Sequence, residues 1–172
     1  FGPERIVTSS VANVLHEIDG VNALELYKRY LGDYAANLPS SALLFPLSLE
    51  TSSEDVSTVV RTILTINNDE GTMTFAGNVP VGGKVRFMKA NFDKLVDAAG
   101  EAANGLYTQG EDEPQLAILI SCVGRKLILK ERIEEEVEAV RAALPGSTVI
   151  MGFYSYGELS PMTDNGKCAL HN

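Results

Sequence analysis

The sequence predicts an α+β fold, in which helices pack on a mixed, largely antiparallel sheet that includes one βαβ crossover. In the first half of the chain, β-prone runs are separated by short turn sequences, as in antiparallel sheets. In the second half, an apolar run at residues 116–120, a helical segment and another apolar run at 149–151 follow in the order of a right-handed crossover between parallel strands.

The first predicted element is a pair of strands. Residues 6–8 and 14–18 are β-prone, meet around Asn13, and end at the turn dipeptide Asp19-Gly20. We expect the two runs to pair with each other.

A short amphipathic helix is predicted next. Asn22 offers an N-cap oxygen, and Glu25 follows three residues later, as in a capping box. Leu24, Tyr27 and Leu31 then fall at helical spacing before a glycine ends the segment.

Four further β-prone segments follow in the first half. Residues 43–49 are apolar, but Pro46 has no N–H to donate to a ladder, so we expect an edge strand or an irregular extended segment. Residues 59–66, 72–76 and 84–89 are separated by turn-forming sequences. We expect these three runs to form a meander.

The second half begins with a predicted helix. Asn91 is its N-cap, and the apolar residues that follow, up to Ala99, share one face. The polar residues 109–114 predict a loop. The run at 116–120 has no polar alternation, which is typical of a central strand covered on both faces.

Residues 131–144 form the clearest predicted helix. Acidic residues in its first turn and Arg141 near its end suit the helix dipole. We interpret the acidic run at 134–136 as a solvated face without a function. The apolar stripe consists of Ile133, Val137, Val140 and Leu144.

Composition limits the function classes. A chain of 172 residues, with 45% hydrophobic and 22% charged residues, is expected to form a single soluble domain over residues 1–172. The formal net charge of -9 argues against a nucleic-acid partner. The apolar runs are too short to span a bilayer, so we expect no membrane partner.

Cysteine usage and the first residues suggest the setting of the chain. The two cysteines, Cys122 and Cys168, are far apart and are interpreted as reduced thiols of a cytoplasmic protein. The chain opens on Phe1 without an initiator methionine. We therefore expect a domain excised from a larger protein whose preceding half is absent.

Seven ordered segments carry a resemblance to a known family. They are residues 13–20, 23–32, 60–64, 75–82, 121–125, 152–158 and 170–172. In this order they resemble the C-terminal domain of the FIST family, the F-box and intracellular signal-transduction proteins.

The resemblance implies a bacterial, intracellular sensory domain. Family members are thought to bind small molecules, amino acids among them, for attached kinase, cyclase or chemotaxis outputs. The family pairs this domain with an N-terminal FIST domain. The resemblance therefore implies a small-molecule ligand, an N-terminal FIST domain and a signalling output domain as partners. We expect no cofactor.

The first candidate ligand-binding residues follow the apolar strand at 116–120. Cys122 lies where that strand leaves the sheet, although a free cysteine is also a common small buried residue. Arg125 follows a glycine and offers a planar fork suited to the carboxylate of an amino acid or organic acid. A structural ion pair with an acidic residue is the alternative for Arg125.

The other candidates lie near the C-terminus. Tyr154 and Tyr156 alternate in a strand, so both would face one side, and Glu158 follows after a turn. Aromatic faces and a carboxylate suit an ammonium group, although a tyrosine pair on one face is also typical of a core. His171, in the last family-like segment, completes the ligand-binding set.

Catalysis and metal binding have weak support. Cys122 and His171 can be assembled into a thiol-dependent hydrolase, but no nucleophile motif is present. No short Cys or His spacing indicates a zinc site. We therefore expect a non-enzymatic sensory domain. The alternative is an interaction domain whose aromatic segment packs against the N-terminal half or an output partner, and a hydrolase is the third hypothesis.

Overall fold

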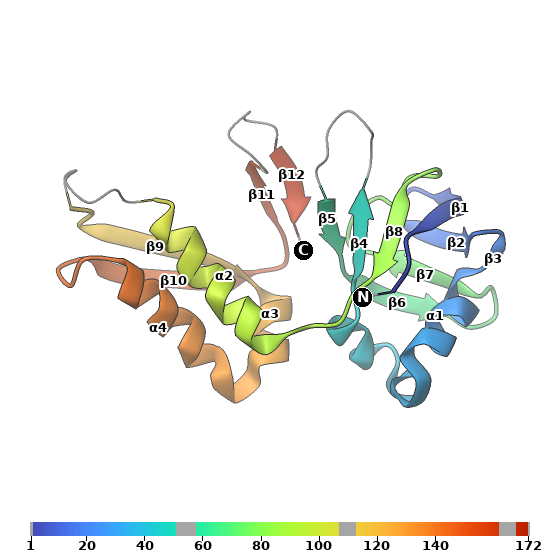
Figure 1. Cartoon of the computed structure of the whole chain (residues 1–172), viewed down its shortest axis with the longest axis horizontal. Coiled ribbons are helices and arrows are strands. Elements are labelled where there is room, and N and C mark those ends of the chain that lie inside the picture. Colours follow the sequence, from blue (N-terminus) through green and yellow to red (C-terminus); the bar gives the residue numbers. More distant parts are fainter. Residues whose placement is uncertain (1, 51–57, 107–112, 162–167, 172) are drawn as a thin grey trace. The chain divides into compact units, whose positions relative to one another are not determined.

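The computed structural model describes residues 2–50, 58–106, 113–161 and 168–171, with backbone alone at 160–161 and 168–171. The chain divides into two compact units, which are described separately. The first comprises Phe1–Ala90 with Leu159–Asn172, and the second comprises Asn91–Glu158. The predicted fold class is confirmed, because the chain is a mixed α+β fold with a largely antiparallel sheet and a parallel strand pair joined by helices (Figure 1).

The first unit is built on an antiparallel sheet, which has eight strands within the described residues. Its order is β5-β4-β8-β1-β2-β7-β6, and β3 pairs with β2. β5 and β6 end this path on opposite sides, yet only Thr62 separates them in the sequence. The sheet must therefore curl back on itself into a nearly closed barrel. The strands are β1 (Arg5–Val11), β2 (Val14–Ile18), β3 (Val21–Asn22), β4 (Leu47–Glu50), β5 (Thr58–Arg61), β6 (Ile63–Asn67), β7 (Thr72–Phe75) and β8 (Lys84–Phe87).

The predicted pair of N-terminal strands and the helix after it are confirmed. β1 and β2 are antiparallel neighbours. The helix α1 (Ala23–Leu31) begins after Asn22, whose Oδ1 accepts the N–H of Glu25 at 3.0 Å. Gly32 ends the helix with φ 57°, in the left-handed region that glycine tolerates best. Two short 3-10 segments, Gly32–Asn37 and Ser40–Leu44, lead on to β4.

The core of this unit fills the inside of the curled sheet and the space beneath α1. Its largest fully buried side chains come from both the strands and the helix. They are Tyr27, Phe75, Phe87, Leu15, Ile18, Leu24, Leu47, Leu49, Met73, Val7, Val79 and Val85.

Tyr27 provides a test of this core. Its ring is buried against Phe87, with centroids 5.6 Å apart, and its hydroxyl donates to the carbonyl oxygen of Phe45 at 2.8 Å. Burial raises the pKa of the phenol above its usual range, so Tyr27 remains neutral. Replacement of Tyr27 by Phe is expected to cost about 1 kcal/mol in urea unfolding, because the Phe45 carbonyl loses its buried partner. Tyr34→Phe, at an exposed ring, should change the free energy of unfolding by less than about 0.5 kcal/mol.

Of two further predictions for the first unit, one is wrong and one is confirmed only in part. The segment with Pro46 is not an edge strand, because β4 lies between β5 and β8. Pro46 precedes the first strand residue, so its missing N–H does not interrupt the ladder. The expected meander forms only in part, because β6 and β7 are antiparallel neighbours but β8 does not join them. The run at 59–66 breaks at Thr62 into two strands, and β8 pairs with β1 and β4 instead of β7.

The second unit contains the predicted crossover. β9 (Leu116–Cys122) and β10 (Val149–Ser155) are parallel and are connected by α3 (Val123–Leu129), a 3-10 turn (Lys130–Arg132) and α4 (Ile133–Ala143). The predicted helix at 131–144 is confirmed as α4, which begins at Ile133. The short helix α3 was not predicted.

The remaining helix of this unit is α2 (Phe92–Asn104), as predicted. Its cap is Asn91, whose Oδ1 accepts the N–H of Lys94 at 3.1 Å. α2 packs closely on α4 where a Cβ added at Gly100 would lie 3.5 Å from the Cβ of Ala139. The predicted loop at 109–114 falls mostly outside the described residues.

The expectation that β9 is covered on both faces is wrong for the described structure. Its residues alternate, and Leu116, Ile118 and Ile120 are each more than half exposed. β10 is its one neighbour within the described sheet. β9 is therefore apolar along its length although one of its two faces is exposed.

Two further observations complete the description. The backbone of β11 (Glu158–Pro161) pairs with that of β12 (Cys168–His171). In the four ranges that the structure describes, no helix is both long enough and apolar enough to cross a bilayer.

Candidate functional site

The ends of the two parallel strands meet at one edge of the second unit. The register pairs Tyr154 with Ser121 and Ser155 with Cys122, so β9 and β10 end side by side. The carboxyl ends of parallel strands are where α/β architectures place ligand contacts. We therefore define the strand-end cluster as the side chains at this edge and those bonded to them. They are Ser121, Cys122, Arg125, Glu136, Tyr154, Ser155 and Glu158.

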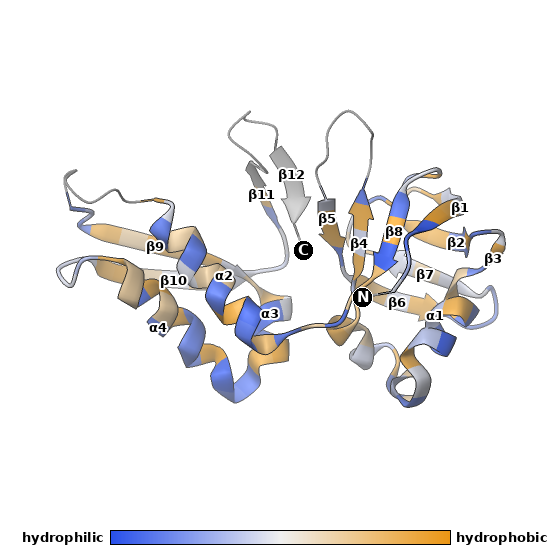
Figure 2. Ribbon diagram, viewed as in Figure 1, coloured by the Kyte–Doolittle hydropathy of each residue, from blue (hydrophilic) through white to orange (hydrophobic). Residues whose placement is uncertain are grey.

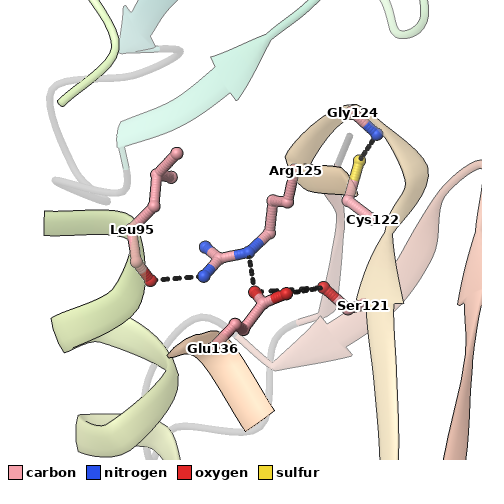
Figure 3. Close-up of polar contacts among 6 residues, drawn as sticks. All are labelled: Leu95, Ser121, Cys122, Gly124, Arg125 and Glu136. Atoms are coloured by element: carbon pink, nitrogen blue, oxygen red, sulfur yellow. Dashed lines mark hydrogen bonds and ion pairs between the residues drawn. The ribbon is translucent and has the colours of Figure 1, made fainter. Parts of the chain in front are cut away.

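A buried ion pair forms the centre of the cluster (Figure 3). Arg125, at the start of α3, donates from Nε to Oε1 of Glu136 on α4 and from Nη2 to the carbonyl oxygen of Leu95 on α2. The hydroxyl of Ser121 donates to both carboxylate oxygens of Glu136, at 3.3 and 3.5 Å. The pair thus links β9, α2, α3 and α4.

Exposure differs between the two charged groups. The Glu136 side chain is 6% exposed, whereas that of Arg125 is 24% exposed. Within the described residues, Nη1 of Arg125 makes no hydrogen bond and points away from the carboxylate (Figure 3). One edge of the guanidinium therefore remains open to a further acceptor.

Tyr154 lies beside the same carboxylate. Burial, the negative charge of Glu136 and a hydrogen bond with that carboxylate raise the pKa of its phenol, against the opposing effect of Arg125, so Tyr154 is neutral. Nζ of Lys126 lies 5.1 Å from the centre of the Tyr154 ring. At this distance the ammonium interacts favourably with the aromatic face.

Cys122 caps the helix that carries Arg125. Its Sγ accepts the N–H of Gly124 at 3.3 Å, and the side chain is half-buried (Figure 3). Its thiol is free. The contact fixes the direction in which α3 leaves β9.

Ser155 and Glu158 form a second contact at the end of β10. The hydroxyl of Ser155 donates to Oε1 of Glu158 and lies 3.3 Å from the carbonyl oxygen of Gly157. Because Ser155 pairs with Cys122 across the strands, Glu158 is attached to the same edge.

Tyr156 does not belong to this cluster, and the side chain of His171 is not among those described. β10 ends at Ser155, so the strand alternation that would place both tyrosines on one side stops before Tyr156, which is 89% exposed. The backbone of His171 belongs to β12, but its side chain lies outside the described part of the chain. Cys122, Arg125, Tyr154 and Glu158 remain as the predicted residues at the strand ends.

Glu136 was not predicted as a site residue. We interpreted the run at 134–136 as solvated, but Glu136 is buried, and its carboxylate binds Arg125 and Ser121. The spacing contained a signal, because Glu136 follows Ile133 by three residues and precedes Val140 by four, which puts it on the apolar side of the helix. Glu135, in contrast, forms an exposed ion pair with Arg132.

The structure also contains a cavity of mixed polarity in the first unit. It has a volume of about 320 Å³ and is lined by Asn13, Arg61, Ala76, Gly77 and Asn78. Arg61 is buried and donates from Nε to the carbonyl oxygen of Asn78 at 3.2 Å. Burial lowers its pKa. No group of three or more metal-binding side chains occurs among the residues with described positions.

Comparison with known proteins gives one match. The family described as the FIST C domain matches residues 23–161. No curated protein and no solved structure matches the chain.

Proposed function

Because this chain belongs to the FIST C domain family, which is found in signalling proteins, we propose that it is a sensory domain that binds a small polar ligand at the strand-end cluster. The ligand class is an amino acid or another small carboxylic acid. Binding alters the order of the cluster, and this change is relayed to an attached signalling output.

The observation that carries this proposal is the register of β9 and β10. It pairs Tyr154 with Ser121, and it pairs Cys122 with Ser155, whose hydroxyl donates to Glu158. Residues 33 positions apart in the sequence thus form one edge. Such an edge is a common place for ligand contacts in crossover folds.

Arg125 is proposed as the carboxylate anchor. Its Nε and Nη2 are held by Glu136 and the Leu95 carbonyl, so the guanidinium has a fixed orientation. The open edge at Nη1 can then donate to a ligand carboxylate with little loss of side-chain entropy. The alternative role of Arg125 is a purely structural ion pair with Glu136, and the Arg125→Lys variant separates the two roles.

Tyr154 and Glu158 are proposed to recognise the remainder of the ligand. The neutral phenol of Tyr154 can donate to the ligand in place of Glu136, and Glu158 offers a carboxylate for an ammonium group. Cys122 shapes the mouth of the site through its contact with Gly124. Tyr156 and His171 remain predicted ligand contacts.

We propose binding without catalysis. The Cys122 thiol contacts the N–H of its own helix, which supports a capping role over that of a nucleophile. A free thiol also suits a cytoplasmic protein. Family membership implies an associated FIST N domain as a partner of this domain.

Ligand-dependent stabilisation tests the proposal. Thermal-shift measurements with the standard amino acids and with succinate, glutarate and acetate should find at least one compound that raises the Tm in a saturable manner. A ligand at 100 times its Kd stabilises by about 2.7 kcal/mol. In Arg125→Lys the shift should disappear, because an ammonium next to Glu136 keeps the charge but loses the planar fork.

Two control variants locate the ligand. Arg141→Lys changes another partly buried arginine of this unit, whose Nη1 donates to the Thr148 carbonyl at 2.6 Å, and should keep the shift. Arg61→Lys alters the lining of the cavity in the first unit and should keep the shift too. Loss of the shift in Arg61→Lys alone would place the ligand in that cavity and contradict the assignment to Arg125.

A further inference from the structure

One face of the β9-β10 sheet is apolar and open in the second unit. We define this apolar sheet face by six side chains that point away from the helices, each of them more than half exposed. Figure 2 shows the hydrophobic colouring along β9. The six residues are Leu116, Ile118, Ile120, Val149, Met151 and Phe153.

The six side chains form one continuous patch. The parallel register places them opposite one another in three cross-strand pairs. The pairs are Leu116 with Val149, Ile118 with Met151, and Ile120 with Phe153. None of the six carries a charge or a hydrogen-bonding group. The patch therefore has the composition of a core, although it lies at the surface of its unit.

A sheet of this type requires cover on both faces. Parallel strands are almost always buried on both sides, and helices supply the cover on one side here. Six half-exposed side chains of this size present about 600 Å², the upper limit for the largest apolar patch of a typical monomer. Each partner in a standard interface buries roughly 800 Å². The patch is large enough to form the centre of a stable interface.

We propose that the FIST N domain packs on the apolar sheet face. Membership in the FIST C family implies that a FIST N domain accompanies the chain, and this domain can be a permanent partner. The absence of charge among the six residues suits a permanent contact, which resembles a divided core, better than a partner that binds and leaves. A second copy of the chain is disfavoured, because each copy has a net charge of -9. This proposal does not depend on the ligand.

Oxidation of Met151 measures the cover directly. Its side chain is 57% exposed in the centre of the face, so dilute hydrogen peroxide should convert it readily to the sulfoxide in the 172-residue chain. In the protein that carries both FIST domains, the rate at Met151 should fall by roughly tenfold or more, since the thioether is then buried. Mass spectrometry of the Met151 peptide gives the rate, and the fully buried Met73 serves as the unreactive reference.

Matched variants show that the face itself makes the contact. Ile118→Glu in the two-domain protein should return the Met151 rate to that of the 172-residue chain, because a carboxylate cannot be buried against an apolar partner. Leu64→Glu should leave Met151 protected, although Leu64, on β6, is as exposed as Ile118 at 58%. Both substitutions replace exposed side chains, so far-UV circular dichroism should remain unchanged.

Three outcomes would overturn the proposal. Equal, fast oxidation in the two proteins would place the FIST N domain elsewhere. Slow oxidation of the 172-residue chain at every concentration would show that the chain covers its own face. Protection that grows with the concentration of the 172-residue chain would assign the face to a second copy.

Discussion

Glu136→Ala is expected to destabilise the second unit by about 3 kcal/mol, the largest effect of any single polar substitution that we propose. The carboxylate is 6% exposed and accepts hydrogen bonds from Arg125 and Ser121. Its removal leaves a partly buried guanidinium without its counter-charge and a hydroxyl without its acceptor. Hydrogen exchange of the α4 amides, followed in urea, gives the free energy of opening of this unit.

Two comparisons separate the ion pair from general effects of charge on α4. Glu134→Ala lies in the same acidic run at an exposed position and should change the same free energy by less than about 0.5 kcal/mol. The double variant Arg125→Met with Glu136→Leu should recover most of the loss, because an apolar pair of similar volume needs no counter-charge. A loss below about 1 kcal/mol for Glu136→Ala would show that the pair contributes little.

Gly152→Ala is expected to cost about 2–3 kcal/mol, because an added methyl group has no room between β10 and β9 there. A Cβ at this position would lie 2.2 Å from the carbonyl oxygen and 2.8 Å from the Cβ of Leu119. The nearest atom belongs to the backbone of the paired strand, so no side chain can move aside to accommodate the methyl group. The strands must separate locally, and urea unfolding should show the loss.

Gly146 supplies the matched control for this substitution. It lies shortly before β10, and an added Cβ would have no neighbour within 4 Å. Gly146→Ala should therefore leave the free energy of unfolding within about 0.5 kcal/mol of the parent value. An equal effect of the two substitutions would mean that the contact with Leu119 does not limit this position.

Local signals predicted the elements, and long-range pairing decided how they join. The side-chain caps at Asn22 and Asn91 act within three residues, so the starts of α1 and α2 could be predicted. The position of β4 between β5 and β8 depends on ladder bonds to distant residues, which no local pattern contains. A meander was expected for the same reason, because the pairing of β8 with β1 and β4 also depends on distant residues.

The candidate site was predicted in part for a similar reason. The end of an apolar strand pointed to Cys122 and Arg125, and the parallel register then brought Tyr154 to the same edge. Glu136 was missed because acidic runs are normally solvated, and its burial depends on the arginine that faces it. The run at 116–120 was expected to be covered on both faces because its composition is that of a buried strand. The composition does not tell which other part of a protein supplies the cover.

The pairing of β1 also has a consequence for synthesis of the chain. β1 lies between β2 and β8, so Arg5 pairs with Val85, which is distant in the sequence. During translation β1 and β2 emerge well before β8, the strand that pairs with the other side of β1. The backbone groups on that side have no ladder partner until then, and such late, distant pairing slows folding. The barrel of the first unit therefore closes only after Phe87 has left the ribosome.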